Sequence, residues 1–269
     1  MFRRLGLALS LLPACALAQT ATLEAQLALR SELPGFGGLS AVELSEDGTR
    51  AHALSDRGAA FSLILVRKDG RLTDAQVSAW NGPVIAGDSE GLAIGAGKSV
   101  YSTEGPAGLR ETHGSALPDH PDFADFPLNA GFEALAVAPD GTLWAIPEAR
   151  DGGVLRTYLY AGGWARGPDI LATEGFRPSG ADFGPDGWLY LLERRVTTLG
   201  FQARVRQIDP ATGDAKELLR TAPSPAANFE GIGVWQDQAG TLRLTLIADN
   251  NFIVFVENRF VEYVLTPLE

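Results

Sequence analysis

Cysteine is almost absent from the sequence, with a single residue, Cys15, among 269. Cys15 falls inside an N-terminal segment, 1–18, that we predict to be cleaved, so the mature chain, 19–269, contains no thiol. Disulfide stapling and cysteine-based catalysis are therefore excluded. The stability of the mature chain must come from a buried core, and a chain of this length can bury a large one.

Long apolar runs are also absent beyond the first residues of the chain. Arg3 and Arg4 precede the apolar run 5–12, and a small-x-small cleavage site stands at 16–18, which together are typical of a secretory signal peptide. The run is too short for a permanent membrane span. Pro13 is unusual in a lipoprotein site, so we expect export to the periplasm or outside the cell without lipid attachment.

Basic residues are few, with 22 against 33 acidic ones and a net charge of −11. Loss of Arg3 and Arg4 with the signal leaves 20 basic residues against 33. This balance argues against nucleic acid and anionic membranes as partners and is compatible with cation binding. We expect a soluble monomer that acts on a small molecule.

Long amphipathic helices are missing as well, because 31 glycines and 16 prolines interrupt the chain every few residues. Many short strands are expected instead. The clearest hairpin lies in 129–150, where the turn Asp140-Gly141 separates the alternating segments 132–137 and 142–147. Its outer ends carry Glu133 and Glu148, which pairing about the turn would place side by side.

The same hairpin recurs along the chain. Its copies open at positions 40, 90, 133, 179 and 230, and each ends on an acidic residue. A period in the forties is typical of a propeller of four-stranded units. Further strand pairs are expected at 61–67 with 75–80, 155–160 with 164–172, 203–209 with 215–220, and 252–256 with 260–265.

These repeats predict an all-β protein in which the mature chain, 19–269, is one β-propeller of five four-stranded antiparallel blades. Counting leaves a sixth, degenerate blade open. The second blade is irregular, because its outer half, 105–128, is loop-like and rich in proline and aspartate. The strand 22–30 belongs to none of these five blades, and we expect it to pair with the last blade and close the ring.

Seven motifs follow one another along the mature chain. They are Ser55-Asp56-Arg57-Gly58, Ser89-Glu90-Gly91-Leu92, Ser102-Thr103-Glu104-Gly105, Asn129-x-Gly131-Phe132-Glu133-Ala134-Leu135-Ala136, Leu192-Glu193-Arg194-Arg195, Asn228-Phe229-Glu230-Gly231-Ile232 and Asp249-Asn250-Asn251-Phe252. In this order they resemble a bacterial family called esterase-like activity of phytase. The resemblance covers nearly the whole mature chain and implies an exported propeller that hydrolyses esters or phosphoesters, without implying a set of catalytic residues. Ala134 departs from the pattern, which usually has glycine there.

Candidate functional residues follow from propeller geometry, since the innermost strands line the axis. The first residues of the hairpins should form one ring at a single mouth of the channel, namely Ser40, Glu90, Glu133, Ser179 and Glu230. We assign the three glutamates of this ring to catalysis and treat the serines as small residues in the glutamate position. The hairpin ends should form a second ring, for which we predict metal ligands at Asp56, Glu104, Glu148, Glu193, Asp249 and the neighbouring Asn250.

Converging carboxylates repel one another and require compensation by a cation. A divalent metal, Ca²⁺ in the first place, accepts six to eight oxygen ligands of this kind, to which Asn129 would add an amide oxygen. Arginines next to the acids suit an anionic ester substrate, and we predict that it is bound by Arg57, Arg150, Arg194, Arg195 and Asn251.

The sequence therefore indicates a metal-dependent ester hydrolase that acts on phosphoesters. Two alternatives remain open at this stage. In a non-catalytic binding propeller, the acids would hold the blades together and the arginines would form salt bridges between them. A lactonase-like hydrolase would use similar metal ligands, and fold alone does not choose among the three.

Overall fold

The computed structural model describes residues 19–81, 85, 87–104, 108–127, 131–252 and 255–267. The predicted signal peptide, 1–18, and Asn129 lie outside this part of the chain. No helix within it has the length and apolar character needed to cross a bilayer.

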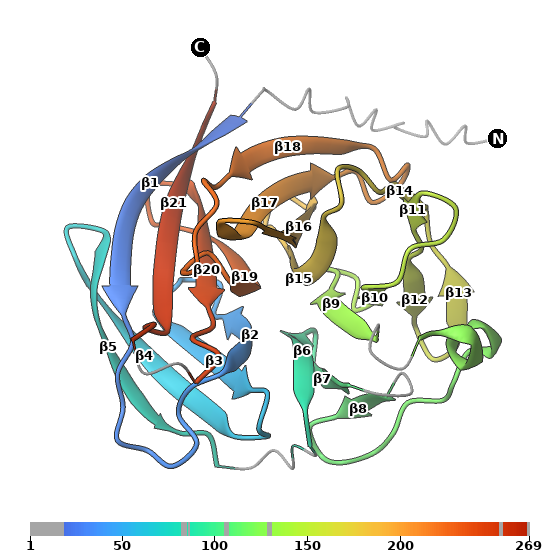
Figure 1. Cartoon of the computed structure of the whole chain (residues 1–269), viewed down its shortest axis with the longest axis horizontal. Helices are drawn as coiled ribbons and strands as arrows, with labels where there is room; N and C mark the ends of the chain where they lie inside the picture. Colours follow the sequence, from blue (N-terminus) through green and yellow to red (C-terminus); the bar gives the residue numbers. More distant parts are fainter. Residues whose placement is uncertain are drawn as a thin grey trace, which may run out of the picture.

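Five antiparallel sheets surround a common axis, so the chain is a five-bladed β-propeller (Figure 1). From the axis outward, blade 1 contains β2 (Leu39–Leu44), β3 (Arg50–Ser55), β4 (Ala60–Lys68) and β5 (Arg71–Ala79), and blade 2 contains β6 (Ser89–Gly95), β7 (Lys98–Thr103) and β8 (Gly108–Glu111). Blade 3 contains β9 (Phe132–Val137), β10 (Leu143–Pro147), β12 (Tyr158–Tyr160) and β13 (Trp164–Arg166). Blade 4 contains β15 (Arg177–Phe183), β16 (Leu189–Thr197), β17 (Gly200–Ile208) and β18 (Ala215–Arg220), and blade 5 contains β19 (Phe229–Gln236), β20 (Leu242–Ala248), β21 (Arg259–Pro267) and β1 (Gln19–Ala28).

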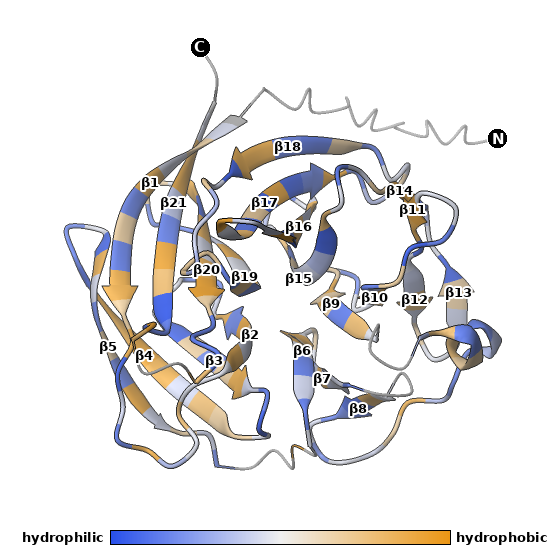
Figure 2. Cartoon of the chain, viewed as in Figure 1, coloured by the Kyte–Doolittle hydropathy of each residue, from blue (hydrophilic) through white to orange (hydrophobic). Residues whose placement is uncertain are grey.

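The expected ring of five blades and its closure by the N-terminal strand are confirmed. The closing strand β1 is the outer strand of blade 5, where it pairs with β21. Bands of polar and apolar residues alternate along both strands, as expected when one face is buried (Figure 2). The prediction of a strand at 252–256 was wrong for its described residues, Phe252, Phe255 and Val256, which lie in turns. β1 takes the place which that strand was expected to fill.

Blade 2 is irregular, as predicted, since it has three strands in the described part of the chain. The segment after β8 forms a short 3-10 helix, η1 (Pro121–Asp125), instead of a fourth strand. The buried ring of Phe123 in η1 packs against Phe132 and Tyr158 of blade 3, with ring centroids 4.9 Å and 5.1 Å away. The region therefore fastens blade 2 to blade 3. Two short strands, β11 (Val154–Leu155) and β14 (Ile170–Leu171), add a separate pair between blades 3 and 4.

The core consists of apolar clusters that lie between neighbouring blades. One cluster joins Leu54 of blade 1 to Tyr101 of blade 2, and others join each following pair of blades around the ring. A final cluster joins Phe260 of blade 5 to Phe61 of blade 1. Every blade is therefore held by both of its neighbours.

A β-bulge interrupts the inner strand of every blade at the same point. In β9, Phe132 pairs with Pro147 and Ala134 with Ile146, so Glu133 is the extra residue. The corresponding register shifts fall at Ser40, Glu90, Ser179 and Glu230. A bulge bends the strand and redirects a side chain, so these five shifts put one redirected side chain per blade at one level of the channel.

Close contact between inner strands explains why the residue that follows each bulge is small. A Cβ atom on Gly231 would lie 2.8 Å from the backbone nitrogen of Val42, and one on Gly91 would lie 3.1 Å from the carbonyl oxygen of Glu133. Blade 3 instead accepts Ala134, which is fully buried. The departure from the family pattern at Ala134 is therefore a methyl group for which this blade has space.

Two acids tie inner strands together further along the channel. Glu43 of β2 accepts a hydrogen bond from the backbone N–H of Ile94 in β6 (3.1 Å). Asp182 of β15 accepts one from the backbone N–H of Val234 in β19 (2.6 Å). Burial raises the pKa of Asp182 to about 7 and that of Glu43 well above its usual range. These links join blade 1 to blade 2 and blade 4 to blade 5.

The contact at Gly231 gives a test of the five-bladed packing. Gly231→Ala should destabilise the protein by about 1–3 kcal/mol, because the new methyl group meets backbone atoms of the next blade. In a domain of this size, each kcal/mol lowers Tm by roughly 2–4 °C. Gly163→Ala is the matched control, since a Cβ atom there meets nothing within 4 Å. Equal Tm values for the two variants would contradict the packing described.

Candidate functional site

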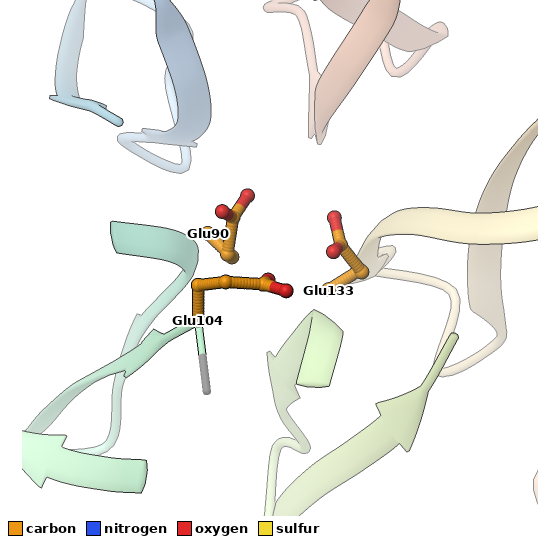
Figure 3. Close-up of side chains that lie close together, drawn as sticks. All are labelled: Glu90, Glu104 and Glu133. Carbon is orange, nitrogen blue, oxygen red and sulfur yellow. The ribbon is translucent and has the colours of Figure 1, made fainter. Parts of the chain in front are cut away.

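Three glutamates from blades 2 and 3 meet at one mouth of the channel (Figure 3). One carboxylate oxygen from each of Glu90, Glu104 and Glu133 lies within 4.8 Å of the other two. Glu230 approaches from blade 5 and lines the narrow channel together with Glu133. The space in this channel is only about 10 Å³, hardly enough for one water molecule. The structure thus brings the three predicted catalytic residues, Glu90, Glu133 and Glu230, to one place, and Glu104 lies there with them.

The second predicted ring forms at the ends of the second strands, with one change. Opposite the residue before each bulge stand Ser55, Thr103, Pro147, Glu193 and Ala248. The next residue reaches the mouth, and these residues are Asp56, Glu104, Glu148, Arg194 and Asp249. Arg194 therefore occupies the place predicted for Glu193, because a slip of one residue moves a side chain to the opposite face of a sheet.

Glu193 is instead buried between blades 3 and 4, away from the mouth. Its carboxylate accepts four hydrogen bonds of 2.6–2.9 Å, two from Arg204 and two from Arg206. Glu193 and Arg204 are at most 2% exposed. With both oxygens occupied by guanidinium groups, Glu193 has no free lone pair directed at a metal, so the structure gives it a structural role.

Serine hydroxyls fix the backbone immediately before each of the three catalytic candidates. Ser40 donates to the carbonyl of Ser89 (2.6 Å), and Ser179 donates to that of Phe229 (3.1 Å). Ser102 donates in the same way to the carbonyl of Phe132. Each donor belongs to the preceding blade, so the orientation of Glu90, Glu230 and Glu133 depends on a contact between blades. Ser40 and Ser179 thus stand in the glutamate position, as the sequence suggested, and the structure adds that their hydroxyl groups hold the next blade.

The carboxylates of Glu90, Glu104 and Glu133 accept no hydrogen bond or ion pair from the described residues. Burial, and then the negative charges of Glu133 and Glu230, raise the pKa of Glu90 to about 10. Burial also raises the pKa of Glu133 to about 8, against the opposing effect of Arg194. The cluster therefore resists ionisation unless a cation joins it.

Glu230 differs from these acids because it has partners. It accepts hydrogen bonds from Arg194 and from the side-chain amide of Asn228 (2.9 Å). Burial raises the pKa of Glu230 to about 7 in spite of Arg194. Asn228 is fully buried and also donates to Asp249 (3.2 Å). Asn228 stands two residues before Glu230 in its motif, and this position was the only sign of its role in the sequence.

Asp56 and Asp249 lie on the blade 1 and blade 5 side of the mouth. Burial, then the charges of Asp249 and Asp88, raise the pKa of Asp56 to about 6, and one of its oxygens is buried without a hydrogen-bond partner in the described part of the chain. Burial also raises the pKa of Asp249. Asp88 is not among the predicted site residues. Its position directly before the Ser89-Glu90 motif could have identified it as a neighbour of the site.

The two asparagines after Asp249 form a turn. The amide oxygen of Asn250 accepts from the backbone N–H groups of Gly38 and Phe252, both at 3.0 Å, which leaves it occupied. Asn251 has a positive φ of 48° and donates its backbone N–H to Asp249 (2.8 Å). The guanidinium of Arg57 lies 3.4 Å above the ring of Phe252, beside Asp56.

The remaining predicted arginines lie outside the ring of the mouth. Arg195 donates to the side chain of Gln202 and stacks on Phe176 at 4.5 Å, so it belongs to the packing between blades. Arg150 donates to the carbonyl of Phe176. Glu148 of the second ring pairs with Arg177 (2.9 Å), which the sequence analysis did not single out.

The donor set at the mouth fits a hard divalent cation. Ca²⁺ binds oxygen at about 2.3–2.6 Å, so two ligands on opposite sides of one ion lie about 4.8 Å apart. The oxygens of Glu90, Glu104 and Glu133 meet that limit. The buried oxygen of Asp56, which has no hydrogen-bond partner among the described residues, is a further candidate metal ligand. Nitrogen and sulfur ligands, which transition metals favour, are absent from this described cluster.

The fold and this acidic mouth define a β-propeller with a candidate metal site at its axis. The sequence profile of the Phytase-like family, described as esterase-like activity of phytase, matches residues 34–252. Because the match covers most of the chain, the protein belongs to this family, as the resemblance implied. No curated protein matches the sequence.

Solved structures with a similar fold share little sequence with the chain. The catalytic domain of a GH62 α-L-arabinofuranosidase from Coprinopsis cinerea has a TM-score of 0.57 at 12% identity, covering 92% of this chain and 97% of that one. A thermostable family-43 glycoside hydrolase has a TM-score of 0.52 at 10% identity, covering 88% and 92%. A glutaminyl cyclase from Myxococcus xanthus has a TM-score of 0.51 at 13% identity, covering 94% and 99%. These similarities support the propeller fold alone.

The raised pKa values predict how stability depends on pH. Between the ordinary value of 4.5 and the folded value of about 8, folded Glu133 keeps a proton that the unfolded chain releases. Stability of the chelator-treated protein should therefore fall as pH rises through this window, with Tm lower by roughly 5–10 °C at about pH 8 than at about pH 5. Millimolar Ca²⁺ should restore most of the loss at about pH 8 and little at about pH 5, as measured by calorimetry. A Tm that is insensitive to Ca²⁺ at both pH values would contradict the cation site.

Glutamine variants should separate the acids of the mouth from Glu193 by the sign of their effects. Without Ca²⁺ at about pH 8, Glu133→Gln should raise Tm because it removes an uncompensated charge, and it should weaken the response to Ca²⁺. Glu193→Gln should cost about 3–5 kcal/mol, since it leaves two buried arginines without their anion, and it should keep the response to Ca²⁺. Glu46→Gln, in an exposed turn, should change neither quantity. Effects of the same sign at Glu133 and Glu193 would refute this assignment.

Proposed function

We propose that the protein is an exported, monomeric, metal-dependent ester hydrolase that acts on phosphoesters at the acidic mouth of the propeller. The observation that carries the proposal is the convergence of Glu90, Glu104 and Glu133 within 4.8 Å, without a hydrogen-bond or ion-pair partner among the described residues. Membership in a family described by the esterase-like activity of phytase supports the reaction class.

Glu90, Glu104 and Glu133 would hold the divalent cation, for which Ca²⁺ is the first candidate. Such an ion, when bound, polarises an ester or phosphoryl oxygen and lowers the pKa of a coordinated water. Asp56 and Asp249, at the edge of the same mouth, would complete the ligand shell directly or through water. An exported protein meets millimolar Ca²⁺, which suits a site of modest affinity.

Glu230 is the residue best suited to accept a proton from the attacking water. Its pKa of about 7 is close to the pH at which an exported protein works. Arg194 and Asn228 hold one of its oxygens, which fixes the direction of the carboxylate. In the proposed reaction, water oxygen bonds to phosphorus, the bond from phosphorus to the alcohol oxygen breaks, and a proton passes to the departing alkoxide.

Arginines around the mouth would bind the anionic substrate. Arg194 neutralises the acids on one side, and Arg57 lies at the rim beside Asp56. Guanidinium groups bind phosphate with two parallel hydrogen bonds. A metal on one side and arginines on the other would place the ester between them.

Hydrolysis of an aryl phosphate, an aryl acetate and an aliphatic lactone, with Ca²⁺ and after chelation, tests the proposal. The wild-type protein should release alcohol from the phosphate in a Ca²⁺-dependent manner, and Glu133→Gln should lower kcat/KM at least about 100-fold. Glu230→Gln should remove the acidic limb of the pH profile near about pH 7.

Glu46→Gln is the matched control and should retain wild-type rates. Turnover of the lactone alone would favour a lactonase. Ca²⁺ binding without turnover of any of the three substrates would refute the hydrolase and leave the binding propeller as the function.

A further inference from the structure

A cavity of about 940 Å³ lies beside the acidic mouth, between blades 3 and 4. Its walls come from η1 and the residues after it, from the segment 147–151 at the end of β10, from Arg156 and Tyr158, and from Gly175 and Arg177 at the entry to β15. Glu148 belongs to both places, because it lines the cavity and its charge raises the pKa of Glu133 and Glu104. A molecule in this cavity would therefore extend to the proposed hydrolytic site.

Two of the three arginines that line the cavity are neutralised by carboxylates of its walls. Arg177 pairs with Glu148 (2.9 Å), and Arg156 pairs with Asp151 and approaches Asp122 at 3.6 Å. These pairs bring the walls together and leave little net charge for a ligand.

Arg150 is different, because no carboxylate of the described residues lies within 4.0 Å of it. Its bond goes to a neutral acceptor, the carbonyl oxygen of Phe176. A guanidinium group carries five N–H donors, so the charge and several donors remain for another partner. Asp125, the one wall carboxylate without an ion pair, is exposed at the end of η1 and would repel an anion from that end.

Arg150 is exposed at the cavity wall, where its hydrogen bond to the carbonyl oxygen of Phe176 ties one of its donors to a well-packed residue. Phe176 is fully buried, and Arg195 and Arg204 stack on its ring at 4.5 Å and 4.3 Å. The bond restricts the guanidinium group and so reduces the conformational entropy that the side chain loses on binding a ligand. The other donors of Arg150 stay available to a planar or tetrahedral anion.

We propose that the cavity is a substrate-binding subsite and that Arg150 selects esters whose alcohol portion carries a second oxyanion, a carboxylate or a phosphate. The ester itself lies at the mouth, and the second anion reaches Arg150 past the Arg177–Glu148 pair. The inference rests on the proposed function for the identity of the ester, and on the cavity and the charge of Arg150 for the second anion.

Calorimetric titration with phenylphosphonates tests the subsite without any turnover. The probes are para-carboxyphenylphosphonate, para-phenylenediphosphonate and the neutral-tailed para-carbamoylphenylphosphonate, each titrated in the presence of Ca²⁺. Wild-type protein should bind at least one of the two probes with an anionic tail about 10-fold more tightly than the carbamoyl probe. The better of the two identifies the second anion as a carboxylate or a phosphate.

Arg150→Gln should bind all three probes with similar affinity. Arg110→Gln is the matched control, since Arg110 also donates to a backbone carbonyl, that of Gly114, and lies on blade 2 away from this cavity. It should keep the wild-type preference. Equal binding of the three probes by the wild type, or a preference that survives Arg150→Gln, would overturn the subsite.

Kinetics with the matching aryl phosphates distinguish failure of this inference from failure of the proposed function. Ca²⁺-dependent hydrolysis with no effect of Arg150→Gln on relative KM values would overturn the subsite and leave the hydrolase intact. A preference for the anionic probes that depends on Arg150, without hydrolysis of any ester, would establish the subsite and refute the hydrolase.

Discussion

One bulge in each inner strand is the constraint on which the site depends. A regular strand would send alternate side chains to the two faces of a blade, where they would meet the neighbouring blade. The extra residue breaks this alternation once per blade and at one level, as at Glu133 between Phe132 and Ala134. The residue at this position differs between the blades. Blades 1 and 4 use serine at this point to hold the next blade, whereas blades 2, 3 and 5 present glutamates.

The number of partners distinguishes the acids that support the fold from those at the mouth. Glu193 is as buried as any residue of the protein, yet two arginines satisfy both of its oxygens. Glu90 is surrounded by acids that all raise its pKa. Burial without compensation is unfavourable for folding, and proteins maintain it where a ligand or a reaction makes use of it. A buried glutamate thus supports the fold in one place and marks the candidate site in the other. Only the contacts of its carboxylate distinguish the two roles.

Much of the architecture could be read from the sequence because each hairpin carries its own turn signal. The turn at Asp140-Gly141, followed by alternating residues, located β9 and β10 almost to the residue. The bulges could not be read, since a bulge is a property of pairing between strands. The error at Glu193 arose from choosing an acid at the strand end. Counting seven residues from the turn glycine leads from Gly97 to Glu104 and from Gly141 to Glu148, and in blade 4 it leads from Gly187 to Arg194, whereas the longer hairpins of blades 1 and 5 need eight and nine residues. The arginine in an otherwise acidic ring was therefore available from the numbering.

That single arginine also makes the ring asymmetric. Arg194 bonds to Glu230, and its charge lowers the pKa of Glu230 and of Glu133. On the opposite side, burial and neighbouring acids raise the pKa values of Glu90 and Glu104 without a comparable cation. A divalent ion would gain most where negative charge is least compensated, which is at Glu90 and Glu104 of blade 2. In the proposed reaction, Glu230, already held by Arg194, would be left for proton transfer. The position of one arginine in the sequence would thus separate the proposed place of the metal from that of the base.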